Sequence, residues 1–316
     1  MDAEADLLPK VLHALLDGSV SFDRMETLMK REPHLNIERT APITGRVCFQ
    51  VFKVIHQLVD SEEDILMVAK TMIQEFAADG IKYLELRSMP REVTETGTGS
   101  VLYVKQLLAA HFSIRQCKQK EVDIDVRFLV AVDRRHGPEV AMDTVKLAED
   151  FLLSSDGIVV GLDLSGDPTV GHGKDLLSAL EKAKNCSLKL VLHLSEVSSQ
   201  RDESVLLLNL PPDRIGHRTF LHPESGGSDS LADKICKQNI PIGKSFPLCL
   251  FLVSHQTDDK GVFCTDLSQE YQLPASTFGL TLAANYIVNH LYLVKRKLFC
   301  TLNNRKVLPL EDSSSF

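Results

Sequence analysis

Short apolar runs rich in Val, Ile and Leu recur along the chain, and longer stretches with helical periodicity separate them. Five clear runs and then three weaker ones follow in chain order: Val11–Leu16, Ile81–Ser88, Ile124–Asp133, Val159–Gly166, Leu188–Glu196, Arg214–Phe220, Ile240–Phe246 and Leu248–Ser254. Runs such as Leu188–Leu192 are apolar almost without alternation, which is typical of parallel strands that are covered on both faces. The repeated βα order therefore favours an α/β barrel or a doubly wound parallel sheet over a sandwich.

Amphipathic stretches lie between these runs. The clearest predicted helix is Ser61–Asp79, where apolar residues fall at helical spacing and Gly80 stands at the position of a C-terminal cap. Asp143–Leu153 and Lys174–Lys184 repeat the pattern, and the region from about 20 to 60 is interpreted as helical elaboration after the first strand. Because no G-x-G-x-x-G follows the first strand, a dinucleotide-binding sheet loses its main support.

Composition limits the class of protein. The chain has 316 residues, a formal net charge of −8 and no run rich in Lys or Arg, which argues against nucleic acid or an anionic membrane as the main partner. Seven scattered cysteines without a C-x-x-C fit a reducing cytosol, and no apolar run reaches the roughly 18 residues needed to span a bilayer. We expect a cytosolic monomer that acts on a small molecule, with one domain over 1–310 and a loose tail at 311–316.

Polar residues that can carry chemistry lie in or just after five of the apolar runs. They are His13, Gly166 with Asp167, His193 with Glu196, His217, and Asp258 with Asp259. In parallel barrels the active site lies at the carboxyl ends of the strands, so these side chains would meet at one mouth. A single histidine of this kind would more often be a buried, hydrogen-bonded core residue, but five coincidences favour a functional site.

The residue types suit a metal-dependent hydrolase. A catalytic zinc ion takes three protein ligands from His and Asp or Glu and keeps a position for water, whose pKa it lowers to about 7. His13, His193 and Asp258 could supply those ligands. Glu196 can reach the same cavity as a proton donor, and Asp259 is a natural further polar group, although paired carboxylates alone are as often a solvated turn.

Seven motifs occur in order from Leu8 to about Leu282: VLHALLDGS, LELRSMPRE, VDRR, LDLSGDP, LHLSE, GHRT and TDDKGVF. Together they resemble the metal-dependent adenosine deaminase family, and most closely its adenosine-deaminase-like branch, the N6-methyl-AMP deaminases. The resemblance implies a (β/α)8 barrel of the TIM type with one zinc ion. It also implies deamination of N6-methyl-AMP, and of related N6-substituted purine nucleotides, to IMP and an amine by attack of hydroxide on purine C6.

The resemblance implies a role for each matching residue. His13, His193 and Asp258 would ligate the zinc ion. Glu196 would protonate the purine ring nitrogen beside the reacting carbon, and His217, assisted by Asp259, would orient the water and help to deprotonate it. The substrate-binding residues would be Asp17, His56, Arg87, Ser88, Met89, Pro90, Asp133, Gly166 and Asp259.

Three features depart from the family's pattern. Leu15 stands where the family has the second histidine of its H-x-H motif, and leucine cannot ligate zinc. Arg218 replaces the glycine of GHG, and the stretch between Pro241 and Asp258 is shorter than in the family, which puts the seventh strand in doubt. Two alternatives stay open: an impaired isoform or pseudoenzyme that keeps a nucleotide-shaped pocket, and a barrel that hydrolyses an amide or a phosphoester.

Overall fold

In a computed structural model, the described residues are 10–30, 52, 54–59, 61–90, 123–217, 219–221, 223, 226–238, 240–243, 253–254, 259–263, 266, 268–269, 272 and 276. Within them, the side chains at 10–13, 22, 62, 242–243, 253–254 and 262–263 are not described. Asp258, Arg218 and the predicted tail at 311–316 lie outside the described residues.

The described strands form one parallel sheet whose spatial order is the chain order, β1 to β8. They are β1 (Lys10–Leu15), β2 (Tyr83–Ser88), β3 (Asp125–Asp133), β4 (Val159–Ser165), β5 (Lys189–His193), β6 (Arg214–Gly216), β7 (Ile242–Gly243) and β8 (Val253–Ser254). All eight predicted runs therefore contain a strand, and the parallel arrangement is confirmed. The seventh strand is described over only two residues, at the place where the sequence put it in doubt.

The segments that follow the first and last strands touch each other. Gly18, shortly after β1, lies so close to Asp259, shortly after β8, that a Cβ atom on the glycine would be 1.9 Å from Asp259 Oδ1. A Cβ atom on Gly261, in α9 (Lys260–Phe263), would likewise be 1.9 Å from the carbonyl oxygen of Val20. The segments after the first and eighth strands therefore meet, as the predicted barrel requires.

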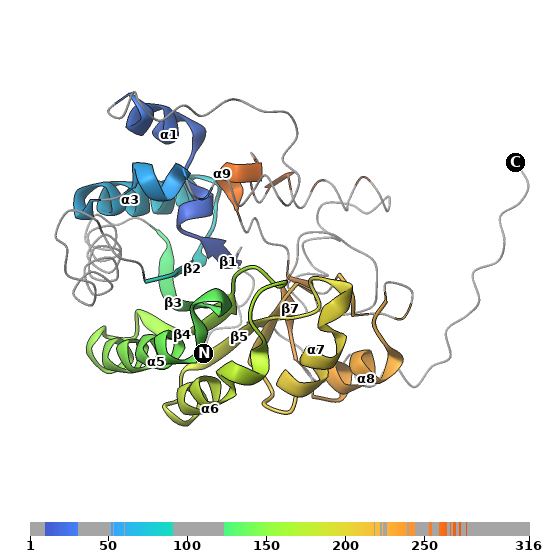
Figure 1. The fold of residues 1–316 in the computed structure, drawn as a ribbon. Coiled ribbons are helices and arrows are strands. Elements are labelled where there is room, and N and C mark those ends of the chain that lie inside the picture. Colours follow the sequence, from blue (N-terminus) through green and yellow to red (C-terminus); the bar gives the residue numbers. More distant parts are fainter. Residues whose placement is uncertain are drawn as a thin grey trace, which may run out of the picture.

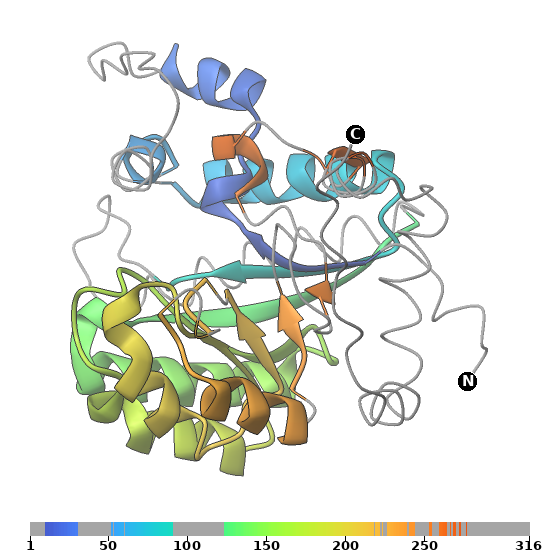
Figure 2. The ribbon, with the colours of Figure 1, turned by 90° about the vertical axis from the view of Figure 1, so that its right-hand side faces the viewer.

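Helices lie outside the sheet on both sides. Figures 1 and 2 show α5 (Gly137–Ser154), α6 (Leu177–Asn185), α7 (Arg201–Leu207) and α8 (Asp229–Gln238) along one side, opposite α1 (Phe22–Met29), α3 (Glu62–Ala78) and α9. The apolar side chains of β3 from Phe128 to Val132 are all buried between these layers. Among the described residues, none of the helices combines the length and the apolarity that crossing a membrane needs.

The helix α3 matches its prediction because its caps are encoded locally. Ser61 is the N-cap, and its hydroxyl oxygen accepts a hydrogen bond from the backbone N–H of Asp64 at 3.1 Å. Gly80 follows the helix with a φ of +83°, which glycine adopts at little cost. The predicted apolar face, from Ile65 to Phe76, is buried against the sheet.

Several predicted boundaries were wrong by a few residues. Strand β5 ends at His193 and not at Glu196, because Ser195 adopts a φ of +56°, and β6 ends at Gly216 because His217 adopts a φ of +58°. Left-handed backbone of this kind cannot continue a strand. Helix α5 begins six residues before its predicted start, since Pro138 suits a first helical turn. The predicted helix at Lys174–Lys184 begins as the 3-10 turn η5 (Gly173–Leu176).

Candidate active site

His193, Glu196 and His217 lie together after the carboxyl ends of β5 and β6. Each offers one ligand atom, and these three atoms all lie within 4.8 Å of one another. The two imidazole rings meet edge to face with their centroids 4.6 Å apart, and His193 Nδ1 lies 3.4 Å from Glu196 Oε1. His193 is buried, whereas Glu196 and His217 are half-buried, so a molecule from solvent can reach the latter two.

The local backbone explains how this cluster forms. Gly216 pairs with His193 across β5 and β6, and a Cβ atom on the glycine would lie only 2.6 Å from His193 Cδ2. A side chain at this position would therefore displace the imidazole ring. Ser195 and His217 both hold the left-handed backbone conformation, which costs energy in residues other than glycine and which clusters at functional sites.

Asp163, on β4, belongs to the site although the sequence analysis did not single it out. Its side chain is fully buried, and its Oδ1 lies 3.4 Å from His193 Nε2 and 3.7 Å from Arg87 Nη1. Burial lowers the pKa of His193, but the carboxylates of Asp163 and Glu196 outweigh burial and raise that pKa to about 9. The signal that could have found Asp163 is a charged residue inside the apolar run LDLS, because a buried charge requires a partner.

A second group of predicted residues lies after β1 and β8. Asp17, in the 3-10 turn η2 (Asp17–Ser19), is buried, and its Oδ2 lies 3.2 Å from Nε2 of His56. The buried side chain of Asp259 packs against Gly18, the neighbour of Asp17. Three residues that are far apart in the sequence and were all predicted to bind substrate or assist catalysis are therefore brought to one place.

A third group joins the ends of β3 and β4. A Cβ atom on Gly166 would lie 2.4 Å from Asp133 Oδ1, and Gly166 has a φ of +100°, so only glycine fits this close approach. The Asp133 carboxylate also accepts hydrogen bonds from Arg135, at 2.8 Å from the backbone N–H and 2.9 Å from Nε. Asp133 and Gly166 are thus held side by side.

The remaining predicted residues lie at the end of β2 or outside the described part of the chain. Arg87 is buried in the interior against Asp163, Ser88 ends β2, and Met89 and Pro90 follow it. The side chain of His13 and the whole of Asp258 are not among the described residues. His13 falls in an irregular stretch, because the register between β1 and β2 shifts between Val11 and Ala14.

The donors at the cluster fit a divalent metal ion. Two imidazoles and a carboxylate within 4.8 Å of one another are ligand types that zinc takes in proteins. In the predicted roles only His193 of these three is a ligand, and Glu196 and His217 act beside it. The carboxylates of Asp163 and Glu196, each 3.4 Å from a ring nitrogen of His193, stabilise positive charge at this place. Of the predicted ligands His13, His193 and Asp258, only His193 has a described side chain, and Leu15, at the place of a further ligand, offers no donor atom.

Known proteins resemble this chain in sequence and in fold. The family model for adenosine deaminase matches residues 38–250, more than half of the chain. The chain belongs to the adenosine deaminase family. N6-methyl-AMP deaminase from Danio rerio is 68% identical to this family member over 92% of the chain and 91% of the relative.

Solved structures of adenosine deaminase relatives have the same fold. The crystal structure of Arabidopsis N6-mAMP deaminase superimposes with a TM-score of 0.78 at 26% identity and covers 96% of this chain and 98% of its own. Arabidopsis ADAL complexed with IMP gives a TM-score of 0.74 at 26% identity and covers 96% of this chain and 97% of its own. The predicted family and barrel are therefore confirmed, while the roles of individual residues stay predictions.

Proposed function

We propose that the chain is a zinc-dependent aminohydrolase that converts N6-methyl-AMP and water to IMP and methylamine in the cytosol. The assembly of His193, Glu196 and His217 at the strand ends is the observation that carries this proposal, because hydrolytic deamination needs a metal site beside a proton donor. The substrate is supported by the 68% identity to a curated N6-methyl-AMP deaminase and by a related structure complexed with IMP, the proposed product.

Glu196 acts as the general acid. Its carboxyl group is partly exposed, with 19% of the side chain accessible, and it lies in the turn after β5 beside His193. In its protonated form it donates a proton to purine N1 as C6 is attacked, so that no anion develops on the ring. Acid catalysis of this kind contributes about 10²–10⁴-fold to a rate.

His217, assisted by Asp259, orients the attacking water molecule and accepts its proton. His217 lies against His193 and is half-buried, so its imidazole is placed to orient the water and accept its proton. Asp259, whose buried side chain packs against Gly18, assists. His13, His193 and Asp258 would hold a zinc ion, which would lower the pKa of water to about 7 and so make hydroxide available at neutral pH.

The other strand ends would hold the nucleotide. Two pairs of residues lie near the carboxyl ends of the strands and would contact the substrate. One is Asp17 with His56, and the other is Asp133 with Gly166. The segment Arg87–Pro90 at the end of β2 would complete the binding surface. Each of these contacts binds or orients the substrate and moves no proton.

A second candidate function is a non-catalytic relative that retains a nucleotide-shaped pocket. Leu15 is the observation that favours it, because this side chain is half-buried at the end of β1, opposite Arg87 in the register, and cannot ligate a metal ion. Such a protein would bind IMP or AMP without turnover and would hold zinc weakly. The third possibility, hydrolysis of another bond, has no support from the relatives, whose names describe deaminases.

Product analysis tests the substrate assignment. The purified chain, supplied with zinc, is incubated with N6-methyl-AMP or with N6-methyladenosine, and IMP, inosine and methylamine are quantified by chromatography. We expect IMP and methylamine in equal amounts from the nucleotide and at least about tenfold slower turnover of the nucleoside, since losing a charge-assisted hydrogen bond to the phosphate costs about 1.5–3 kcal/mol and each 1.4 kcal/mol is about tenfold. Equal turnover of both compounds would contradict the nucleotide assignment.

A further inference from the structure

Hydrogen bonds to buried polar side chains, which lie outside the reacting centre, fix the turn that carries Glu196. This turn joins β5 to the 3-10 turn η6 (Ser198–Gln200) and to α7. The backbone N–H of Glu196 donates to Oε1 of Gln200 at 3.0 Å, and Nε2 of Gln200 donates to Oε1 of Glu203 at 3.4 Å. Gln200 is only 4% exposed, so its side-chain amide makes its hydrogen bonds to these protein groups and not to water.

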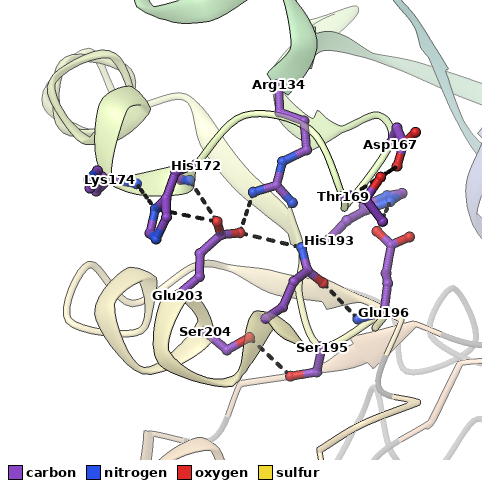
Figure 3. A network of polar contacts seen from close by, with 12 residues as sticks. Arg134, Asp167, Thr169, His172, Lys174, His193, Ser195, Glu196, Glu203 and Ser204 are labelled. Carbon is purple, nitrogen blue, oxygen red and sulfur yellow. Dashed lines mark hydrogen bonds and ion pairs between the residues drawn. The ribbon is translucent and has the colours of Figure 1, made fainter. Parts of the chain in front are cut away.

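Glu203 is in turn fixed by loops from two other strands. Its carboxylate accepts from the guanidinium of Arg134, which follows β3, and from the backbone N–H of Gly173 at 2.8 Å. The Nδ1 atom of His172 lies 3.5 Å from Glu203 Oε2, the oxygen that accepts the hydrogen bond from Gly173. Figure 3 shows Glu203 between Arg134 and His172, with Glu196 at the far end of the same network. Arg134 and Glu203 are both buried, so their ion pair is poorly screened by water.

Further hydrogen bonds fix Ser195, the residue before Glu196. The hydroxyl groups of Ser195 and Ser204 lie 3.1 Å apart and are buried (Figure 3). The carbonyl oxygen of Ser195 accepts a hydrogen bond from the N–H of Phe220 at 2.8 Å. Ser195 holds its left-handed backbone conformation between these contacts. Strained backbone persists only where its surroundings fix it, so the position of the turn is determined from both sides.

We propose that Gln200, backed by Glu203 and Arg134, is a positioning residue that sets the Glu196 carboxyl against the substrate. Arg134 directly follows Asp133, so the same network links the proton donor to the end of β3, where the substrate is expected to bind. The long side chain of Glu196 can deliver a proton to a fixed point only if its backbone is fixed. This inference rests on the proposed function, because it takes Glu196 as the acid.

Two variants test the proposal. Gln200→Met keeps the shape of the side chain but removes both hydrogen bonds. Gln74→Met makes the same change at an exposed position on α3 and serves as the control. The readouts are kcat and KM with N6-methyl-AMP, the unfolding temperature, and hydrogen exchange at the Glu196 amide.

We expect Gln200→Met to lower kcat by about 10–100-fold with KM within about threefold of the parent, since a misplacement of about 1 Å can cost on the order of 10²-fold. The Glu196 amide should exchange at least about tenfold faster while global unfolding is little changed. The control Gln74→Met should behave as the parent.

Two results would overturn the proposal: an unchanged kcat in Gln200→Met when the parent is active, or unchanged exchange at the Glu196 amide. Absence of turnover in the parent and in Leu15→His would contradict the proposed function alone. In that case the exchange rate decides whether Gln200 holds Glu196.

Discussion

Oδ1 of Asp163 lies 3.4 Å from Nε2 of His193, across the pairing of β4 with β5, and both side chains are buried. Glu196 contacts the other ring nitrogen of the same histidine at 3.4 Å. The orientation of the imidazole is therefore fixed from both sides. Carboxylate partners of this kind orient ligating histidines and strengthen metal binding.

Removing the Asp163 carboxylate should weaken metal binding. We expect Asp163→Asn to reduce the affinity for zinc by about 10–100-fold, the usual effect of losing such a partner. The measurement is zinc affinity by competition with a chelating dye, which does not depend on turnover. Asp143→Asn, an exposed change on α5, should leave the affinity unchanged. Equal affinity in Asp163→Asn and the parent would show that Asp163 only balances the charge of Arg87.

The acid role of Glu196 predicts a loss of turnover without a loss of metal. Glu196→Gln preserves the shape of the side chain but removes the proton, so kcat should fall by about 10²–10⁴-fold. Zinc content, measured by atomic emission, should stay within about twofold of the parent, since the proposed ligands are other residues. A variant that keeps its turnover would assign Glu196 a structural role.

Gly216 should be required for the position of His193. In Gly216→Ala the new Cβ atom would lie 2.6 Å from His193 Cδ2, so the ring must move and zinc affinity should fall. Gly157→Ala is the matched control, because that position has open space but a φ of +76°. The control should lose roughly 1–2 kcal/mol of unfolding free energy through backbone strain alone and keep its zinc affinity. The same affinity in both variants would contradict the steric argument.

The sequence predicted the order of elements well because each strand is a continuous apolar run between amphipathic helices. It predicted the ends of β5 and β6 poorly, since the left-handed conformations of Ser195 and His217 carry no glycine signal. Asp163 and Glu203 were missed because each acts through a partner far away in the sequence, His193 and Arg134 respectively, and only the fold brings these partners together. Gln200 was missed although its partners Glu196 and Glu203 lie near it in the sequence, because its hydrogen bonds depend on the conformation of the turn.

Leu15 decides between an enzyme and an inactive relative, so the most direct test measures zinc and products together. The purified chain and Leu15→His are loaded with zinc and dialysed, and zinc per chain and the rate of IMP formation from N6-methyl-AMP are measured in the same samples. We predict turnover in the parent, with zinc occupancy raised by Leu15→His because an imidazole replaces an apolar group at the ligand position. The absence of IMP from both proteins, with zinc retained in Leu15→His, would contradict the proposed activity.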